Sequence, residues 1–566
     1  MPERVVFGED ADGRPVYVTP EQRSMHLHVI GATGRGKSRF LEQLIRQDIR
    51  HRHGLCLIDP HGELVAEVVR WCARYDLQNR RRVHVIDPND TSWTLGFDPL
   101  RCDDREYVPR TVDAAVAACA QVWGGEDTSK TPLLKRCLRA VFFALVAAKR
   151  PFADAMFLTN ATDTAGLRAA LTTELEDPIF QALWDDLNAM SRREFTETFS
   201  STNSRLIEFL ASPTIRQMLS LREHALDVAQ CMEQGDILLV NLQPKKVSHD
   251  NARLIGTLLT NALFTAAVRR DPREAKRRPF YLYIDECYRF LTEDVESMLD
   301  ETRKFGLHVT LSHQHLGQLR KYGEHVFNAV MTNTGTKVVF GGLPDDDAEL
   351  MARQILRPIF DFNRPKELLN KPTVVGFQKV LMQHRGQAEG IATAEGTSSM
   401  LANMSGMSAA TSQTFGADGL PLGGIATQIE GQTSGLSQGY GSSQSVVRSV
   451  VTSSGVSEAW LPILETLPTT VESEAEILHQ STLAVRTLPR QLFILAEPWA
   501  PPQLVRTPDV SSPAVRPARI ERFVADSRTA SPYLVPAAVA AQQIAERAAP
   551  ASVPEEDDDL YSVPVQ

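Results

Sequence analysis

The chain has 566 residues, 43% of them hydrophobic and 23% charged, so it is long enough to form several domains with buried cores. Its formal net charge of −10 excludes a protein with a uniformly basic, nucleic-acid-coating surface, although a local basic channel remains open. The seven cysteines are scattered, without a CxxC pair, which argues against a disulfide framework or a zinc site and fits a reducing, cytoplasmic setting.

The first 25 residues hold two short β-prone runs around the turn "EDADG", and we interpret residues 1–25 as an N-terminal β flap. The segment does not have the form of a signal peptide. The longest apolar runs, such as Ala140–Ala148, fall far short of the ~20 residues that a transmembrane helix needs. We therefore expect a cytoplasmic protein without an intrinsic transmembrane segment, recruited to the inner membrane, if at all, through a partner.

The segment from His28 to Leu41, "HVIGATGRGKSRFL", joins a short apolar run, three glycines and a lysine. Its centre, "GATGRGKS", fits G-x-x-x-x-G-K-[ST] between a β-prone run and a run of helical period. Glycines allow backbone N–H groups to turn around a phosphate, and the following helix adds its dipole. The pattern predicts an ATP site in which Lys37 binds the β- and γ-phosphates and Ser38 binds Mg²⁺. The predicted nucleotide-binding residues of this loop are Gly31, Thr33, Gly34, Gly36, Lys37 and Ser38.

A second buried strand follows in "GLCLIDPHGEL", residues 54–64, and it ends in polar side chains. Ligands of open α/β sheets bind at the carboxyl edge of the strands. Asp59, His61 and Glu63 are therefore candidates for a position near the phosphates, with local capping as an equal alternative for His61 and Glu63. We assign residues 26–100 to the first part of an ATPase core.

Residues 101–225 are rich in Ala, Leu and Arg with helical periods, which predicts an all-α insertion domain. The run "GDILLVNLQ" then returns the chain to the sheet, and we assign residues 226–388 to the second part of the core. Alternation of apolar strands with amphipathic helices indicates an α/β fold with a doubly wound sheet.

The run "YLYIDE", residues 281–286, is an apolar strand that ends in two carboxylates. In combination with the upstream loop, Asp285 is expected to hold Mg²⁺ through water. Glu286 is expected to polarise the attacking water, because a glutamate next to the aspartate favours hydrolysis over simple nucleotide sensing.

The run "DETRKFGLHVTLSHQHLGQL", residues 300–319, contains a helix end, a glycine turn and a further strand. Gln314 follows that strand, where a polar side chain can sense the γ-phosphate. Arg303 and Lys304 precede the strand, on the end of the helix.

The segments "GATGRGKS", "IDPHGEL", "YIDE", "RKFGLHVTLSHQ" and "NTGTKVVFGG" follow one another in this order. Together they resemble the HerA/FtsK superfamily of ring-forming, DNA-pumping ATPases, and within it the TraG/TraD-type coupling proteins of conjugation and type IV secretion. The resemblance covers residues 5–365 and resumes near residues 480–508. It implies a RecA-like P-loop NTPase core with a mainly parallel sheet and supports the all-α insertion domain.

The resemblance also implies roles for residues outside the loop. Arg303 matches the arginine finger, donated into the site of a neighbouring subunit, with Lys304 as an equally placed alternative. Gln314 matches the glutamine of motif III. The implied partners are further copies of the chain in a hexamer, and DNA that is bound through its backbone without sequence preference.

The composition changes after the predicted core. Residues 389–456 are dominated by Ser, Gly, Thr and Gln, and we expect a flexible segment. Residues 457–509 contain "RTLPRQLFILAEP", which predicts a strand that returns to the edge of the sheet. Residues 510–566 form a Pro- and Ala-rich tail, expected to be disordered, whose acidic end could dock on a basic partner.

Several functions fit these features. The first is an ATP-driven DNA translocase in conjugative transfer or type IV secretion. A HerA-like motor of a defence or DNA-processing complex and an ATPase that handles protein substrates are alternatives, and a nucleotide-gated scaffold is a third class. The histidines show no metal-ligand spacing and are expected to be core or strand-end residues.

Overall fold

The computed structural model describes most of the chain, except for the N-terminal residues 1–3, several internal segments and residues 549–566. The described residues are 4–124, 132–162, 166–271, 277–356 and 473–548, with short strands at 365–367, 373–383, 388–394, 409–415, 421–428, 445–451, 456–465 and 470–471. The chain divides into two compact units, Met1–Phe360 with Leu478–Gln566, and Asp361–Ile477.

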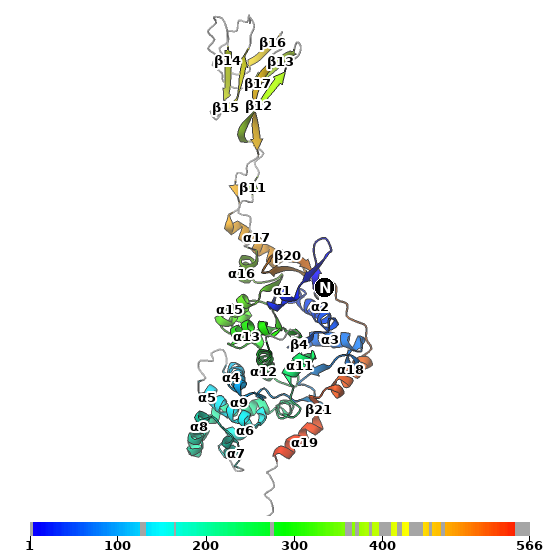
Figure 1. Ribbon diagram of the computed structural model, residues 1–566, viewed down its shortest axis with the longest axis vertical. Coiled ribbons are helices and arrows are strands. Elements are labelled where there is room, and N and C mark those ends of the chain that lie inside the picture. Colours follow the sequence, from blue (N-terminus) through cyan, green and yellow to red (C-terminus); the bar gives the residue numbers. More distant parts are fainter. Residues whose placement is uncertain are drawn as a thin grey trace, which may run out of the picture. The chain divides into compact units, whose positions relative to one another are not determined.

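One large sheet forms the centre of the first unit (Figure 1). Its strands are β1 (Val5–Glu9), β2 (Pro15–Val18), β3 (Leu27–Ile30), β4 (Gly54–Asp59), β5 (Val83–Ile86), β7 (Ile237–Asn241), β8 (Phe280–Ile284), β9 (Leu307–His313), β10 (Thr336–Phe340), β19 (Leu492–Glu497) and β20 (Ala500–Arg506). They lie in the order β2-β1-β20-β19-β10-β3-β9-β8-β4-β7-β5. The strands from β10 to β5 are parallel, whereas β19, β20, β1 and β2 continue the sheet in antiparallel pairs. The expected α/β fold with a mainly parallel sheet is confirmed.

Helices α2 (Lys37–Arg50) and α3 (Glu63–Arg74) cover one face of this sheet. The helical spacing of apolar residues in α2 places Phe40 in the core, where its ring centroid lies 5.2 Å from that of Phe7 and 5.2 Å from that of Phe493. Phe7 belongs to β1 and Phe493 to β19. Strands β1 and β19, which are distant in the sequence, therefore share one core with the helix that follows the glycine-rich loop.

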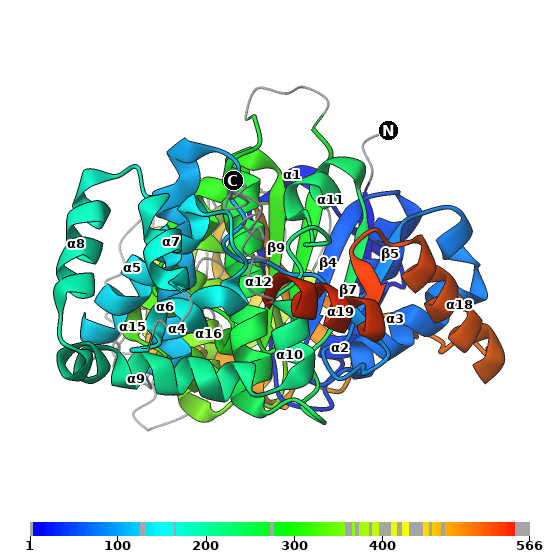
Figure 2. The ribbon, with the colours of Figure 1, turned by 90° about the horizontal axis from the view of Figure 1, so that it is seen from below.

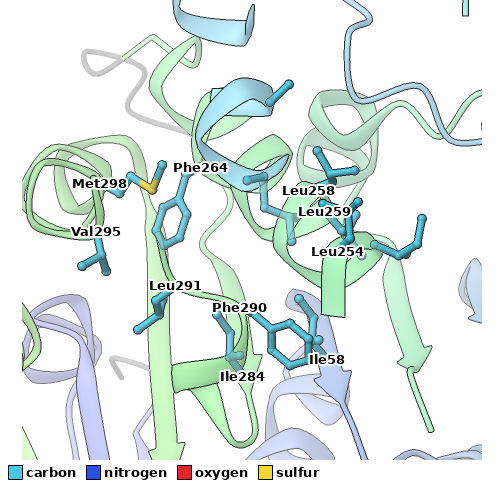
Figure 3. Packing of buried hydrophobic residues seen from close by; sticks show 14 of the residues in the cluster. Ile58, Leu254, Leu258, Leu259, Phe264, Ile284, Phe290, Leu291, Val295 and Met298 are labelled. Atoms are coloured by element: carbon cyan, nitrogen blue, oxygen red, sulfur yellow. The ribbon is translucent and has the colours of Figure 1, made fainter. Parts of the chain in front are cut away.

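Helices α12 (His249–Val268) and α13 (Val295–Thr302) cover the opposite face. Figure 3 shows Ile58 and Ile284 of the sheet in the same cluster as leucines of α12 and Phe290. Gly256 lets α12 approach Phe290 closely, because a Cβ atom at this position would lie 2.3 Å from the Phe290 ring. This packing fixes the segment directly after β8.

A group of helices lies between β6 (Trp93–Leu95) and β7. They are α4 (Val108–Trp123), α5 (Pro132–Ala147), α6 (Ala155–Thr159), α7 (Leu167–Thr173), α8 (Pro178–Ala189), α9 (Arg192–Leu210), α10 (Pro213–Met218) and α11 (Val228–Gln234). Seen from below, α7, α8 and α9 lie at the opposite end of the unit from α3 (Figure 2). No helix among the described residues is long and apolar enough to cross a membrane.

Part of the tail that was expected to be disordered is folded. Helix α18 (Pro517–Ala530) packs on α3, with Phe523 buried and Arg519 donating to the Ala73 carbonyl at 2.9 Å. Strand β21 (Leu534–Pro536) then pairs with β6, and α19 (Ala537–Ala548) follows. The tail is rich in Pro and Ala, and its few apolar residues gave no clear helical pattern in the sequence. Their helical spacing is nevertheless sufficient for α18 to pack on α3. The acidic end of the tail lies outside the described residues.

The second unit contains antiparallel strands within and around the segment that was expected to be flexible. One sheet has the order β12-β17-β15-β14, and β13 pairs with β16. The bounds are β12 (Thr373–Gln383), β13 (Ala388–Ala394), β14 (Ala409–Phe415), β15 (Pro421–Gln428), β16 (Ser445–Val451) and β17 (Val456–Glu465). Thr, Val and Ile in these runs favour strands, although Ser and Gly dominate the composition. The rest of residues 389–456 lies outside the described residues.

Two runs rich in arginine, at residues 79–84 and 269–278, lie beside the amino ends of β5 and β8, and two of their arginines have structural roles. Arg81 donates to the His53 carbonyl at 2.8 Å. Arg270 is buried, donates to the Arg278 carbonyl at 2.9 Å and pairs with Glu233 at 2.8 Å. These two guanidinium groups bind backbone carbonyls at the amino edge of the sheet.

Candidate active site

The glycine-rich loop connects β3 to α2 at the carboxyl edge of the sheet. Gly34 has φ 77° and Gly36 has φ 119°, and L side chains rarely adopt such values. Helix α2 starts at Lys37, directly after Gly36, so the free N–H groups of its first turn face the loop. Thr33 and Ser38 are exposed on this loop and at the helix start.

Lys37 is folded back onto the loop. Its Nζ donates to the Gly31 carbonyl and lies 3.4 Å from the Ala32 carbonyl. Burial lowers the pKa of Lys37, and the nearby carboxylates of Glu286 and Asp285 oppose this shift. The cation therefore lies between the loop and the acidic end of β8.

A chain of hydrogen bonds joins the loop to Glu286. The Thr33 hydroxyl donates to Gln314 Oε1 at 2.9 Å, and Gln314 Nε2 donates to Glu286 Oε1 at 2.8 Å. Gln314 follows β9 and Glu286 follows β8, and both strands end at the edge that carries the loop. Three segments that are distant in the sequence thus meet at one point.

Glu286 adopts an unusual backbone conformation. Its φ of 46° and ψ of 50° place a non-glycine residue in the left-handed region, which costs on the order of 1–3 kcal/mol and clusters at functional sites. The side chain is buried, and its carboxylate is held by Gln314. The strain at Glu286 is offset by the packing of the following segment against α12.

Asp285 and Asp59 lie side by side at the ends of β8 and β4, because the Asp285 N–H donates to the Ile58 carbonyl at 3.1 Å. Burial, together with the negative charges of Glu286 and Asp59, raises the pKa of Asp285 to about 6. Asp59 also accepts from the N–H groups of His61 at 2.8 Å and Val65 at 3.1 Å. The carboxylates provide the oxygen ligands that Mg²⁺ prefers.

The other two candidates after β4 are placed differently. The side chains of His61 and Glu63 are exposed at the turn and at the start of α3. Asp59, by contrast, is buried and caps the backbone of this turn. Of the three predicted residues, Asp59 alone contributes to the charge around Asp285.

Arg303 and Lys304 lie at the opposite edge of the sheet. They form the short turn Arg303–Phe305 before β9, and both side chains are exposed. Strand β9 has seven residues, so about 20 Å of strand separates them from Gln314 at its far end. In the described part of the chain, the Arg303 side chain has neither a hydrogen bond nor an ion pair, and its field reaches His26. Neither residue can act on the site of its own subunit.

His26, His28 and His313 are buried within or beside the strands, as expected, whereas His315 is exposed. His28 and His313 stack with ring centroids 4.8 Å apart, and burial lowers the pKa of His313 to about 3. One group outside the site was not expected: His84, Cys231 and Asp236 lie close together. The two ring nitrogens of His84 already lie 2.8 Å from Ser531 Oγ and 3.2 Å from Asp236 Oδ2.

Sequence reasoning missed Gln318. Its Oε1 accepts from the Gln314 N–H at 2.9 Å, and its Nε2 lies 3.5 Å from Glu286 Oε2. The Leu316 N–H donates to Asp347 Oδ2 at 2.6 Å, which anchors the same turn. The four-residue spacing of Gln314 and Gln318 was the available signal, but only the folded turn shows that both side chains face Glu286.

Comparisons with known proteins agree with the motifs. Residues 5–117 match the family model for the central domain of the helicase HerA. Residues 169–357 match the family model for the DNA-binding domain of type IV secretion-system coupling proteins. The predicted resemblance to HerA-like ATPases and coupling proteins is confirmed for these two parts of the chain.

Several solved structures are similar over most of the chain. The unbound bacterial conjugative coupling protein TrwBdeltaN70 is 14% identical, with 89% of each chain covered and a TM-score of 0.49. Plasmid coupling protein TrwB in complex with ADP and Mg²⁺ is 15% identical, with 90% of this chain and 91% of that chain covered and a TM-score of 0.49. VirB4 of Thermoanaerobacter pseudethanolicus is 14% identical, with 62% and 88% covered and a TM-score of 0.42. No curated protein matches.

Proposed function

We propose that this chain is the subunit of an ATP-hydrolysing, ring-forming motor that translocates DNA, in the manner of coupling proteins of conjugation or type IV secretion. The observation that carries the proposal is the hydrogen-bonded chain from Thr33 through Gln314 to the strained Glu286. It joins a phosphate-binding loop to a candidate catalytic carboxylate, which a protein that only senses nucleotide does not need.

The residues present fit a nucleotide with Mg²⁺. Loop carbonyls hold the Lys37 ammonium group at the place where phosphate oxygens of a triphosphate would accept hydrogen bonds from it. Burial and the neighbouring carboxylates of Glu286 and Asp59 raise the pKa of Asp285, and a divalent cation would relieve the repulsion among the three carboxylates. Ser38 and Asp285 would hold the cation, which would neutralise charge that develops on the transferred phosphate.

The protein groups then have distinct tasks. Glu286 accepts a hydrogen bond from the attacking water and orients it toward the γ-phosphate. Gln314 holds the Glu286 carboxylate and the Thr33 hydroxyl at once, so a change at the phosphate loop is transmitted to the base. Gln314 directly follows β9, which connects this edge of the sheet to the Arg303 turn.

The position of Arg303 supports action between subunits. The exposed guanidinium lies about one strand length from the site of its own chain and is free to enter a neighbouring one. A positive charge supplied in trans would make hydrolysis depend on ring assembly. We infer a ring, with a hexamer as the form suggested by the resemblance, and DNA as the transported polymer on the basis of the coupling-protein family match.

Nucleotide binding and turnover test this proposal in two variants. Lys37→Ala should lose ATP binding, because the phosphates lose their cation. Glu286→Gln should bind ATP with Mg²⁺ but should hydrolyse it at less than about one hundredth of the wild-type rate. Near-normal turnover by either variant would remove that residue from its assigned role.

A further inference from the structure

The sheet edge that carries the glycine-rich loop continues beyond the catalytic side. On one flank of β3 lie β9 and β8, which end at Gln314 and Glu286. On the other flank lie β10, β19 and β20. Strand β19 is antiparallel to β10, so its first residues lie at the same edge as the loop, and so does the end of β20.

Gln491, directly before β19, is fixed against the loop. Its N–H donates to the Arg35 carbonyl at 2.9 Å, and its own carbonyl accepts from the Thr507 N–H at 2.8 Å. A Cβ atom on Gly36 would lie 3.5 Å from the Gln491 Cα. The backbone of Gln491 therefore forms the wall of the loop on the side away from Glu286.

Gln491 also has a left-handed backbone, with φ 68°. Such a conformation in a glutamine is uncommon and, like that of Glu286, is held in place by its surroundings. A non-glycine residue in this region thus flanks the loop on each side. On the catalytic side the strained residue presents a carboxylate, and on the other side it presents an amide.

The Gln491 side chain is paired with a carboxylate. Its Nε2 donates to Asp509 Oδ1 at 2.9 Å, and the Asp509 side chain is exposed. The backbone between them is tied to the loop, because the Arg35 guanidinium donates to the Leu488 carbonyl at 3.2 Å. The pair is therefore both anchored to the phosphate loop and accessible from solvent.

The direction of a bound nucleotide follows from this layout. The loop wraps the phosphates, and the terminal phosphate must face Glu286 and Asp285 for hydrolysis. The opposite end of the triphosphate then leads toward β10 and β19, where Gln491 and Asp509 lie. A carboxylate in that position is suited to accept hydrogen bonds from ribose hydroxyls.

We propose that Asp509, oriented by Gln491, binds the ribose hydroxyls of the nucleotide. This inference rests on the proposed function, because it assigns the nucleoside end of the same site. It makes the segment that returns from the second unit part of the nucleotide site. Gln491 is a positioning residue, and Asp509 is the residue that contacts the ligand.

The test compares the binding of three ligands with Mg²⁺ by titration calorimetry: ATP, 2′,3′-dideoxy-ATP and inorganic tripolyphosphate. Wild type should bind ATP more tightly than the other two ligands. Asp509→Ala should weaken ATP binding about tenfold, leave tripolyphosphate binding unchanged, and remove the preference for ATP over the dideoxy analogue. Gln491→Gly, which keeps the left-handed backbone accessible, should have a smaller effect in the same direction.

Asp12→Ala is the matched control, because Asp12 is an exposed carboxylate in the turn between β1 and β2. It should bind all three ligands as wild type does. Equal weakening of ATP and tripolyphosphate in Asp509→Ala, or no preference for ribose hydroxyls in wild type, would overturn the ribose assignment while leaving the ATPase proposal intact. Failure of wild type to bind any of the three would instead refute the proposed function.

Discussion

Contacts from distant segments of the chain fix both the backbone and the carboxylate of Glu286. Its left-handed backbone is held by the packing that follows β8, and its carboxylate is held by Gln314. The same Gln314 side chain contacts Thr33 of the phosphate loop. A substitution at Gln314 should therefore affect catalysis more than nucleotide binding.

Gln314→Ala should lower kcat by on the order of 10²-fold, with a change in the Kd for ATP of less than about threefold, because the base loses its orientation. Gln318→Ala is the comparison variant, since its contact with Glu286 is longer at 3.5 Å. Its loss of kcat should be smaller. Steady-state kinetics and nucleotide titration separate the two parameters, and a selective loss of binding in Gln314→Ala would contradict the assignment.

His26 predicts a dependence of stability on pH. It is buried, its Nδ1 accepts from the Val309 N–H at 3.1 Å, and its Nε2 therefore donates to the Leu299 carbonyl at 2.7 Å. Burial is the main cause that lowers the pKa of His26 to about 4. The neutral ring contributes to the free energy of unfolding, and this contribution is fully present above the pKa of about 6.5 that His26 has in the unfolded chain. It is lost as the pH falls toward the pKa of the folded state, and the loss reaches up to roughly 3 kcal/mol.

Urea unfolding of wild type and His26→Gln between pH 7 and pH 4 measures this effect. The glutamine amide can accept and donate without titrating, so the variant should lose less stability over this range. If the free energy of unfolding falls equally with pH in both proteins, His26 does not contribute to the pH dependence of stability.

The sequence motifs predicted that the loop, the carboxylates and Gln314 would meet at one sheet edge, because each motif is local and follows a recognisable strand. They did not predict the contacts of Gln318, Gln491 and Asp509. Gln491 meets Arg35 only after the chain has returned from the second unit, and nothing in the local sequence indicates that contact.

Among the elements, the alternation of apolar strands and amphipathic helices was sufficient to predict the parallel core. Helix α18 was missed, because its few apolar residues are surrounded by Pro, Ala and Arg, and it depends on α3 for its buried face. The strands of the second unit were missed for a related reason. Their Thr and Val residues are diluted by Ser and Gly, and a strand signal needs a longer uninterrupted run.

Phe523→Ala tests the docking of α18. Phe523 is 1% exposed, in the core that contains α2 and α3, and its removal should lower the free energy of unfolding by about 3–5 kcal/mol. Arg522→Ala on the exposed side of the same helix is the control and should change it by less than about 0.5 kcal/mol. Chemical denaturation measures both changes. Equal free energies of unfolding for wild type and Phe523→Ala would mean that α18 does not pack on the core in solution.

For the whole molecule, the residues of the proposed site lie at two opposite edges of the sheet. The carboxyl edge holds the phosphate loop and Glu286, and the amino edge holds Arg303. In the proposed ring, a complete site consists of the carboxyl edge of one subunit and the amino edge of the next. The order of the sequence motifs suggested that Arg303 acts on a neighbouring subunit. The length of β9, which separates Arg303 from Gln314, supports this hypothesis.

Mixing experiments test the contribution in trans. Arg303→Ala alone should lose most of its ATP hydrolysis, and so should Glu286→Gln alone. Mixed assemblies should regain activity, because an intact Glu286 can meet an intact Arg303 across a subunit boundary. Lys304→Ala in place of Arg303→Ala shows which of the two cations acts. Mixtures that stay inactive at all ratios would place the role of Arg303 within its own subunit.

The most direct test of the motor is ATP hydrolysis by wild type and Glu286→Gln without nucleic acid, with single-stranded DNA and with duplex DNA, at low and moderate salt. We expect DNA to increase the wild-type rate several-fold and the increase to fade with salt, because the contacts are to phosphates. Glu286→Gln should show no increase. Wild-type turnover that is indifferent to both forms of DNA would contradict the proposed DNA translocase and favour an ATPase that handles protein substrates.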